Sequence, residues 1–133
     1  MYGIKRPRLK KFDYRSDGYY FVTIDSNWRE MIFKNREAAV EKELIKTVEG
    51  IGGVSVDTFI VMSNHIHVIL VLQDCSIPLG EVVRKFKARV SRSFGIHAWQ
   101  PNYYEHVIRD EASLNRIRQY IIHNRKSRPS PNR

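Results

Sequence analysis

The sequence predicts an α+β domain whose elements follow the order β-α-β-β-α-β, with one additional helix at the C-terminal end. The first observation behind this prediction is a set of runs rich in β-branched and aromatic residues, which are typical of strands. The second is that apolar residues recur at helical spacing in three other segments. The third is size, because 133 residues with 42% hydrophobic side chains suit one packed domain.

The first strand is expected at residues 19–24 (YYFVTI), after turn-forming residues at 16–18. Asn35 predicts the N-cap of a helix over about 36–49, and Gly50 predicts its end. Apolar residues repeat every four positions in this helix and predict its buried side: Val40, Leu44 and Val48.

Two further strands, 54–61 and 65–72, flank a two-residue turn of Ser and Asn, which predicts a hairpin. After Pro78 a second helix is expected, over about 81–94. A single apolar stripe predicts the buried side of this helix: Val82, Phe86, Val90 and Phe94.

Residues 99–108 predict an extended segment with a late strand, and Asp110 predicts the N-cap of a last helix over about 111–124. The inward-facing residues of this helix are expected to be Leu114, Ile117 and Ile121. The tail, 125–133, is too rich in Pro and Ser to continue the helix. This order is the ferredoxin-like pattern, an antiparallel sheet with helices on one face, which many unrelated functions share.

The whole chain, 1–133, is expected to form a single domain with a basic arm at 1–12 and a basic tail at 125–133. No apolar stretch approaches the length of a membrane span, and the N-terminus lacks the apolar region of a secretory signal. The single cysteine, Cys75, excludes an internal disulfide framework and a Cys-rich zinc site. We therefore expect a soluble, cytoplasmic protein.

The charge is strongly basic and unevenly distributed. The chain has 23 Lys and Arg residues against 14 Asp and Glu residues, a net charge of +9. More than half of the basic residues fall in three segments without any acid, 5–11, 84–92 and 125–133. This pattern favours a polyanionic partner, most simply nucleic acid, and the alternative is a solvated surface with loose tails.

Two histidines, His65 and His67, stand two positions apart in a predicted strand. Side chains alternate between the two faces of a strand, so both imidazoles are expected on the same face. Such a pair can bind one divalent metal ion if a third ligand approaches. The alternative is two unrelated, half-buried histidines.

The last predicted helix carries Tyr120 and, one turn later, Asn124. Its helical position places Tyr120 on the shoulder of the apolar stripe, where its hydroxyl can reach a cleft, and Arg116 lies one turn earlier on the same side. A tyrosine beside a cation and a metal ion is a usable nucleophile, since both favour the phenolate. The alternative is a boundary tyrosine with its hydroxyl in water.

Four blocks occur in an order and at a spacing that carry a resemblance: YR…YYFVTI (14–24), NHIH (64–67), WQ…YYEHVIRD (99–110) and YIIHN (120–124). Over about residues 10–124 the chain resembles the single-tyrosine HUH transposases (IS200-like), and most closely their REP-associated branch. The resemblance implies that Tyr120 is the catalytic nucleophile and that His65, His67 and Asn124 bind Mg²⁺ or Mn²⁺.

The implied reaction is cleavage of single-stranded, hairpin-containing DNA through a 5′-phosphotyrosine, followed by rejoining. The implied setting is the bacterial cytoplasm, in association with the nucleoid. Some members of the family dimerise and others are monomeric, so the resemblance leaves both a homodimer and a monomer open. Basic residues expected to follow the DNA backbone lie on two predicted helices: Arg84, Lys85, Lys87, Arg89, Arg92 and Arg116. Exposed aromatics expected to stack on unpaired bases are among Trp99, Tyr103 and Tyr104. We expect His106 and His123 to be solvent-facing.

The chain departs from the family pattern at two positions, Ser63 and Arg125, where the family usually has Pro. A turn can accept Ser, so the effect of Ser63 is expected to be small, and Arg125 directly follows Asn124. Two other functions stay open. One is a non-catalytic nucleic-acid-binding protein on the same fold, domesticated or decayed. The other is a small metal-dependent RNA nuclease that acts through water and has no need of Tyr120.

Overall fold

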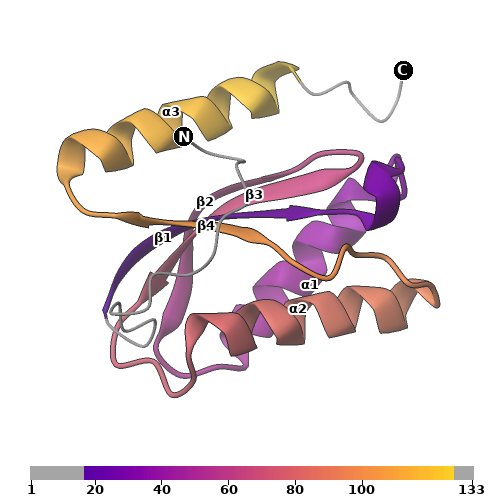
Figure 1. Ribbon diagram of the computed structural model, residues 1–133, viewed down its shortest axis with the longest axis horizontal. Coiled ribbons are helices and arrows are strands. Elements are labelled where there is room, and N and C mark those ends of the chain that lie inside the picture. The colour runs from indigo at the N-terminus through magenta and orange to yellow at the C-terminus, as the bar shows by residue number, and fades with distance from the viewer. Residues whose placement is uncertain (1–16, 128–133) are drawn as a thin grey trace.

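The computed structural model describes residues 17–127 and confirms the predicted α+β fold (Figure 1). Four antiparallel strands form one sheet in the order β2-β3-β1-β4. Their bounds are β1 Gly18–Asp25, β2 Val54–Val61, β3 His65–Leu72 and β4 Tyr104–Ile108. β2 and β3 form the expected hairpin, in which the N–H of Met62 donates to the carbonyl of His65 at 2.8 Å.

Helices cover both faces of this sheet. Their bounds are η1 Asn27–Arg29, α1 Glu37–Glu49, α2 Leu79–Phe94 and α3 Glu111–Ser127. Figure 1 shows α1 and α2 on one face of the sheet and α3 on the other. The ferredoxin-like core thus has its two helices on one face, as expected, and the additional C-terminal helix occupies the opposite face.

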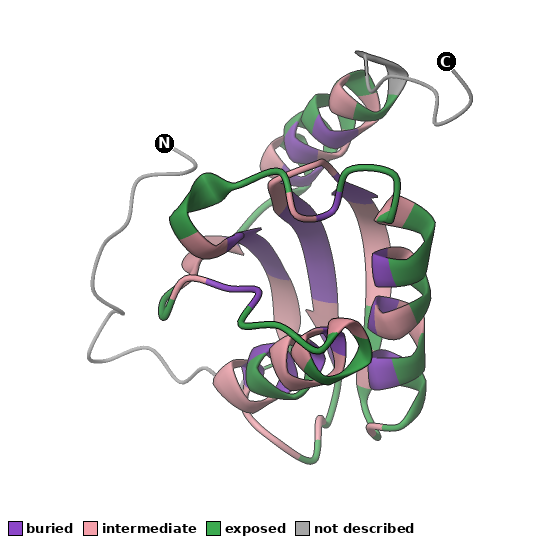
Figure 2. Cartoon of the chain, turned by 90° about the vertical axis from the view of Figure 1, so that its right-hand side faces the viewer, coloured by how far each residue is buried: buried purple, intermediate pink, exposed green. Residues whose placement is uncertain are grey.

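The main core lies between the sheet and the layer of α1 and α2, where the predicted apolar stripes are buried (Figure 2). The buried helical residues are Val40, Leu44, Val48, Val82, Phe86 and Val90. Phe94, the last member of the second stripe, is half-buried and packs against this core. Because strand side chains alternate, every second residue of β1, such as Val22 and Ile24, points into it.

A second, smaller core lies under α3. Leu114, Ile117 and Ile121 are buried there, as predicted. They pack on apolar side chains from all four strands: Phe21, Ile60, Ile69 and Ile108. The guanidinium of Arg118 also holds both carboxylate oxygens of Asp57 on β2, at 2.9 and 2.6 Å. α3 is therefore fixed to the sheet of its own chain by apolar and charged contacts.

The start of α1 differs from the prediction. Asn35 is not the N-cap, because Arg36 occupies that position and makes no side-chain cap bond. Asn35 instead adopts a left-handed conformation with φ 65. Asn is among the few residues that accept this conformation readily, and here it serves the turn before the helix rather than the helix end. Gly50 ends α1 as expected.

At the ends of α2 and α3, one predicted position is confirmed and two differ from the structure. Asp110 caps α3 as predicted, with Oδ1 accepting from the N–H of Ser113 at 2.7 Å. α2 begins at Leu79, directly after Pro78 and two residues earlier than expected. The prediction that the tail at 125 leaves the helix is wrong, since α3 continues to Ser127.

Arg125 explains the longer α3. Its guanidinium donates to the carbonyl of Phe59 on β2 and lies over the Phe59 ring, 5.3 Å from the centroid. An arginine keeps the backbone N–H that proline lacks, so the helix continues and gains this contact with the sheet. The basic arm at 1–12 and residues 128–133 of the predicted tail lie outside the described residues. No helix within 17–127 is long and apolar enough to span a membrane.

Candidate active site

The two histidines of β3 lie side by side on the α3 face of the sheet. Their ring centroids are 4.8 Å apart. Across the ladder, His65 pairs with Asp25 and His67 with Thr23, both on β1. The prediction that both imidazoles share one face is confirmed.

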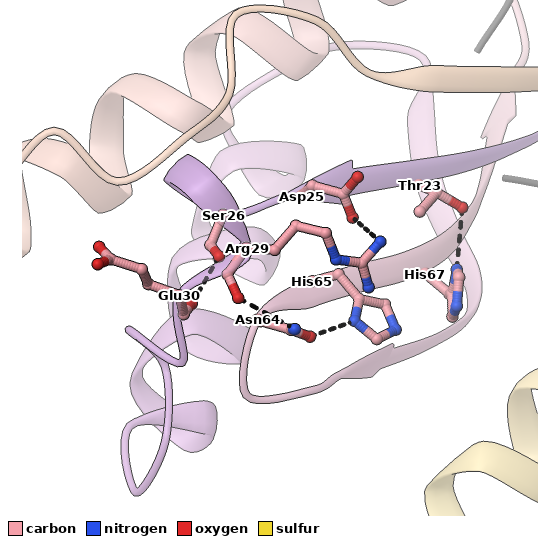
Figure 3. Close-up of polar contacts among 8 residues, drawn as sticks. All are labelled: Thr23, Asp25, Ser26, Arg29, Glu30, Asn64, His65 and His67. Carbon is pink, nitrogen blue, oxygen red and sulfur yellow. Dashed lines mark hydrogen bonds and ion pairs between the residues drawn. The ribbon is translucent and has the colours of Figure 1, made fainter. Parts of the chain in front are cut away.

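Each histidine is held through its Nδ1 (Figure 3). His67 Nδ1 is hydrogen-bonded to the Thr23 hydroxyl at 2.9 Å, and His65 Nδ1 lies 2.6 Å from Asn64 Oδ1. The Asn64 amide is itself oriented, because its Nδ2 donates to the carbonyl of Arg29 at 3.2 Å. The amide oxygen therefore faces His65 and accepts its Nδ1 proton. This leaves the Nε2 lone pair of His65 for a ligand.

Both imidazoles are held in their neutral form. Burial, and to a lesser extent electrostatic repulsion involving His65 and Arg29, lower the pKa of His67 to about 3. Burial and the Arg29 charge also lower the pKa of His65, against an opposing effect of Asp25. A neutral imidazole is the form that binds a metal ion. At neutral pH the pair is thus ready to act as ligands.

Tyr120 lies beside this pair. Its ring centroid is 5.4 Å from that of His67 and 6.4 Å from that of Phe21, with edge-on geometry in both cases. The side chain is nevertheless 46% exposed. This agrees with the predicted place on the shoulder of the helix, where one side of the ring packs and the rest is open to solvent.

Two other predicted site residues, Asn124 and Arg116, also lie on α3. Asn124 is half-buried one turn after Tyr120. Arg116 is exposed, and its guanidinium donates to the hydroxyl of Ser113 in its own helix at 2.9 Å. Among residues 17–127, no third His, Cys, Asp or Glu completes a metal-binding group with the two histidines. A third ligand from this part of the chain would therefore be of another type, such as the amide of Asn124.

Sequence reasoning missed a cation at the site. Arg29 Nη1 lies 3.7 Å from Asp25 Oδ1, and Asp25 is buried (Figure 3). The Arg29 charge lowers the pKa of both histidines, so it acts at the site itself. No motif marks Arg29 in the sequence. It reaches the site only because η1 follows β1 directly.

The basic residues of α2 lie on the opposite layer from the histidines and Tyr120. Three of them have partners within the protein, one in the same helix and two in other segments. Arg84 pairs with Glu81 at 2.9 Å, Arg89 pairs with Glu43 at 3.2 Å, and Lys87 Nζ donates to the carbonyl of Gln100 at 2.8 Å. The remaining two, Lys85 and Arg92, are exposed.

A basic groove of about 320 Å³ runs between α1 and α2 on that layer. The cations that line it come from both helices: Lys46, Arg84, Lys85, Arg89 and Arg92. Four of the five predicted nucleic-acid-binding residues of α2 thus line one groove, which does not include Lys87 and does not join the histidine face.

The aromatic candidates separate into core and surface. Trp99 is a core residue, buried against Phe33 and Phe86, and its indole N–H donates to the carbonyl of Lys87 at 3.0 Å. Tyr103 is half-buried against the same core. Tyr104, in contrast, is half-buried on the histidine face, opposite Thr23.

The two weaker histidine candidates also differ from each other. His123 is exposed, as expected. His106 is half-buried on β4, where it pairs with Phe21 on the histidine face of the sheet. The expectation of a solvent-facing side chain is therefore wrong for His106.

Residues 14–124 match the family described as "Transposase IS200 like". This chain belongs to the IS200-like transposase family. The match includes both histidines, Tyr120 and Asn124, and it confirms the family indicated by the sequence motifs. The protein is accordingly a transposase by family.

The chain is also similar to a relative from another organism and, in fold, to solved structures. An uncharacterized protein of Haemophilus influenzae is 33% identical over 153 aligned positions, which cover 88% of this chain and 85% of the relative. A REP-associated tyrosine transposase solved with a REP hairpin has the same fold, with a TM-score of 0.73 and 22% identity over 93% of this chain and 72% of that chain. A transposase-like protein of Deinococcus radiodurans has a TM-score of 0.53 and 20% identity, over 90% and 97% of the two chains.

Proposed function

We propose that this transposase cuts and rejoins single-stranded DNA through a 5′-phosphotyrosine at Tyr120, with a divalent metal ion at His65 and His67. The observation that carries the proposal is the 5.4 Å separation between the rings of Tyr120 and His67. A tyrosine nucleophile and a pair of neutral imidazoles thereby share one partly open surface. The match to IS200-like transposases supports the same reading.

The histidine pair fits a divalent ion. Both Nδ1 atoms have partners within the protein, which fixes the rings, and both imidazoles are neutral. His65, His67 and the Asn124 amide would hold Mg²⁺ or Mn²⁺. When bound, the ion polarises a non-bridging oxygen of the scissile phosphate.

Tyr120 carries the chemical step. Its Oη forms a bond to the scissile phosphorus while the bond from phosphorus to O3′ breaks, and solvent carries the phenolic proton to the leaving O3′. The products are a 5′-phosphotyrosine and a free 3′-hydroxyl. The covalent intermediate conserves the energy of the broken bond, so a later attack by a 3′-hydroxyl rejoins DNA without ATP. A single tyrosine suffices for both steps.

Hairpin-containing DNA is the substrate we propose. The similar fold of a REP-associated transposase bound to a REP hairpin supports it. In this chain Arg29 supplies positive charge beside the histidines, and Arg116 supplies it one turn before Tyr120. The groove between α1 and α2 offers a second basic surface for the same backbone.

The test is a covalent-adduct assay. Labelled hairpin oligonucleotides with single-stranded flanks are incubated with the wild type and Mg²⁺ or Mn²⁺, then run on a denaturing gel. We expect a protein–DNA band that needs the metal ion and disappears in Tyr120→Phe and in His65→Ala. Tyr19→Phe is the matched control, since Tyr19 is a half-buried tyrosine at the far end of the same sheet face, opposite Val71.

Two other outcomes contradict the proposal. Metal-dependent cleavage that persists in Tyr120→Phe would indicate a nuclease that uses water. Binding without cleavage or adduct, across a broad panel of hairpins, would indicate a non-catalytic nucleic-acid-binding protein.

A further inference from the structure

The most exposed large hydrophobic side chain in residues 17–127 is a tryptophan beside the candidate site. Trp28 is 82% exposed, whereas Trp99, the other tryptophan of the chain, is 3% exposed. Trp28 belongs to η1, directly before Arg29. A tryptophan in this position contributes little to the core, so burial does not explain its presence.

The backbone of this turn is strained. Trp28 has φ 57 and ψ 19, and Arg29 follows with φ 53. Residues other than glycine, asparagine and aspartate rarely adopt this left-handed conformation, since the side chain crowds the carbonyl oxygen. Such strain persists where the surrounding contacts impose it, and it concentrates at functional sites.

Hydrogen bonds on both sides of Trp28 impose this conformation. Before it, the N–H of Ser26 donates to the carbonyl of Asn64 at 2.9 Å, and the N–H of Asn27 donates to the carbonyl of Ala98 at 2.8 Å. After it, the carbonyl of Glu30 accepts from the Ser26 hydroxyl at 2.6 Å (Figure 3). The tryptophan is thus presented on a fixed turn rather than on a loose loop.

Asn64 connects this turn to the histidines. Its amide donates to the carbonyl of Arg29 while its oxygen faces His65 Nδ1. Asn64 thus links the turn that carries Trp28 to His65, with one hydrogen bond to each. The guanidinium of Arg29, held by Asp25, adds positive charge at the same place.

We infer that Trp28 is a base-stacking residue that holds an unpaired nucleotide of the DNA strand beside the scissile phosphate. The inference rests on the proposed function for the identity of the ligand. Every base presents a flat face to an exposed indole, and a neighbouring cation attracts the backbone. The combination of Trp28 and Arg29 at the histidine end of the sheet has the chemistry of a single-strand contact.

Tryptophan emission tests the inference without relying on catalysis. The Tyr120→Phe protein is titrated with a hairpin oligonucleotide that has single-stranded flanks, and with the same hairpin without flanks. We expect the flanked oligonucleotide to quench the exposed Trp28 and to leave the buried Trp99 emission unchanged. In the Trp28→Ala background the quenching should vanish.

Binding affinity gives the second readout. Stacking on one base predicts that Trp28→Ala weakens binding of the flanked hairpin roughly 5- to 150-fold. Binding of the hairpin without flanks should change little, and Trp28→Phe should retain most of the affinity. Met31→Ala is the matched control, because Met31 is an exposed apolar residue just after the same turn. Unchanged Trp99 emission in Trp28→Ala verifies that the variant is folded.

The result that overturns the inference is Trp28→Ala binding the flanked hairpin within twofold of its parent, with no quenching in the parent. The proposed function is tested separately, by whether the wild type forms the covalent adduct. An adduct without Trp28 quenching refutes the stacking role alone. Quenching without any adduct supports the stacking role and refutes the phosphotyrosine mechanism.

Discussion

Thr23→Val tests whether the hydrogen bond to His67 prepares a metal ligand. Valine keeps the β-branched shape of threonine in β1 and removes only the hydroxyl that lies 2.9 Å from His67 Nδ1. Both residues are buried, so water does not readily replace the lost partner. We expect the imidazole to lose its fixed orientation while the strand stays in place.

Two different costs are expected from the loss of this hydrogen bond. Leaving a buried polar atom without its partner costs about 1–3 kcal/mol. Removing the outer hydrogen-bond partner of a metal-binding histidine lowers metal affinity about 10- to 100-fold, which corresponds to about 1.4–2.7 kcal/mol. The first cost falls on the stability of the fold, and the second falls on metal binding. The half-maximal metal concentration should therefore rise about 10- to 100-fold in Thr23→Val.

The assay measures adduct formation against Mn²⁺ or Mg²⁺ concentration. Saturating metal should restore the adduct in Thr23→Val, because Tyr120 and both histidines remain. Thr47→Val is the matched control, since Thr47 is a buried threonine on α1 whose hydroxyl donates to the Glu43 carbonyl at 2.7 Å, away from the site. Equal half-maximal metal concentrations for the two variants would refute the reasoning.

Three further predictions concern the scaffold and the source of the tyrosine. Asp57→Asn should lower the free energy of unfolding by about 1 kcal/mol at pH 7 and by much less at pH 3, as measured by urea denaturation. The reason is that the hydrogen bond from Arg118 holds the pKa of Asp57 below its usual 3.8, so the stabilisation by this carboxylate is lost as the pH falls from 3.8 through the lowered pKa. An equal effect of the substitution at both pH values would contradict this reason. Gly53→Ala should destabilise by about 2 kcal/mol or more in thermal unfolding, because Gly53 has φ 88 and a Cβ there would lie 2.6 Å from backbone atoms of residues 73–75; an unchanged Tm would show that the turn can move. A mixture of His65→Ala and Tyr120→Phe proteins should form no adduct, since α3 packs on its own sheet; restored adduct on the gel would mean that chains exchange this helix.

Features of the fold that depend on residues close together in the sequence could be predicted. The stripe that includes Val40 and the cap at Asp110 depend on residues within one or two helical turns, and both were predicted. Asn35 was misassigned because asparagine serves equally well as an N-cap and in a left-handed turn. The sequence offers no means of separating the two roles without the tertiary structure around them.

Reasoning from the residues alone predicted the candidate site only where its members share one element, and the link between the histidines and Tyr120 came from the family resemblance. His65 and His67 lie on one strand, so their common face follows from alternation. The partner of His67 follows instead from the register between β1 and β3, which pairs it with Thr23. Arg29 reaches the site through a strained turn that no periodicity marks. Residues brought together by tertiary register thus stayed hidden.

Helical periodicity shows which side of α2 is buried but not which face of the sheet it packs on. For this reason the sequence predicts the basic residues of α2 as part of the DNA-binding surface, whereas the structure places them on the layer opposite the histidines. In the structure Arg84 and Arg89 already hold carboxylates, and Arg89 joins α2 to α1 through Glu43. Arg84 is exposed but paired with Glu81, which leaves Lys85 and Arg92 as the exposed cations of this helix outside these ion pairs. We therefore expect Lys85 and Arg92 to make the main contribution of α2 to the salt dependence of DNA binding. A DNA strand that contacts both these residues and Tyr120 must pass around an edge of the sheet.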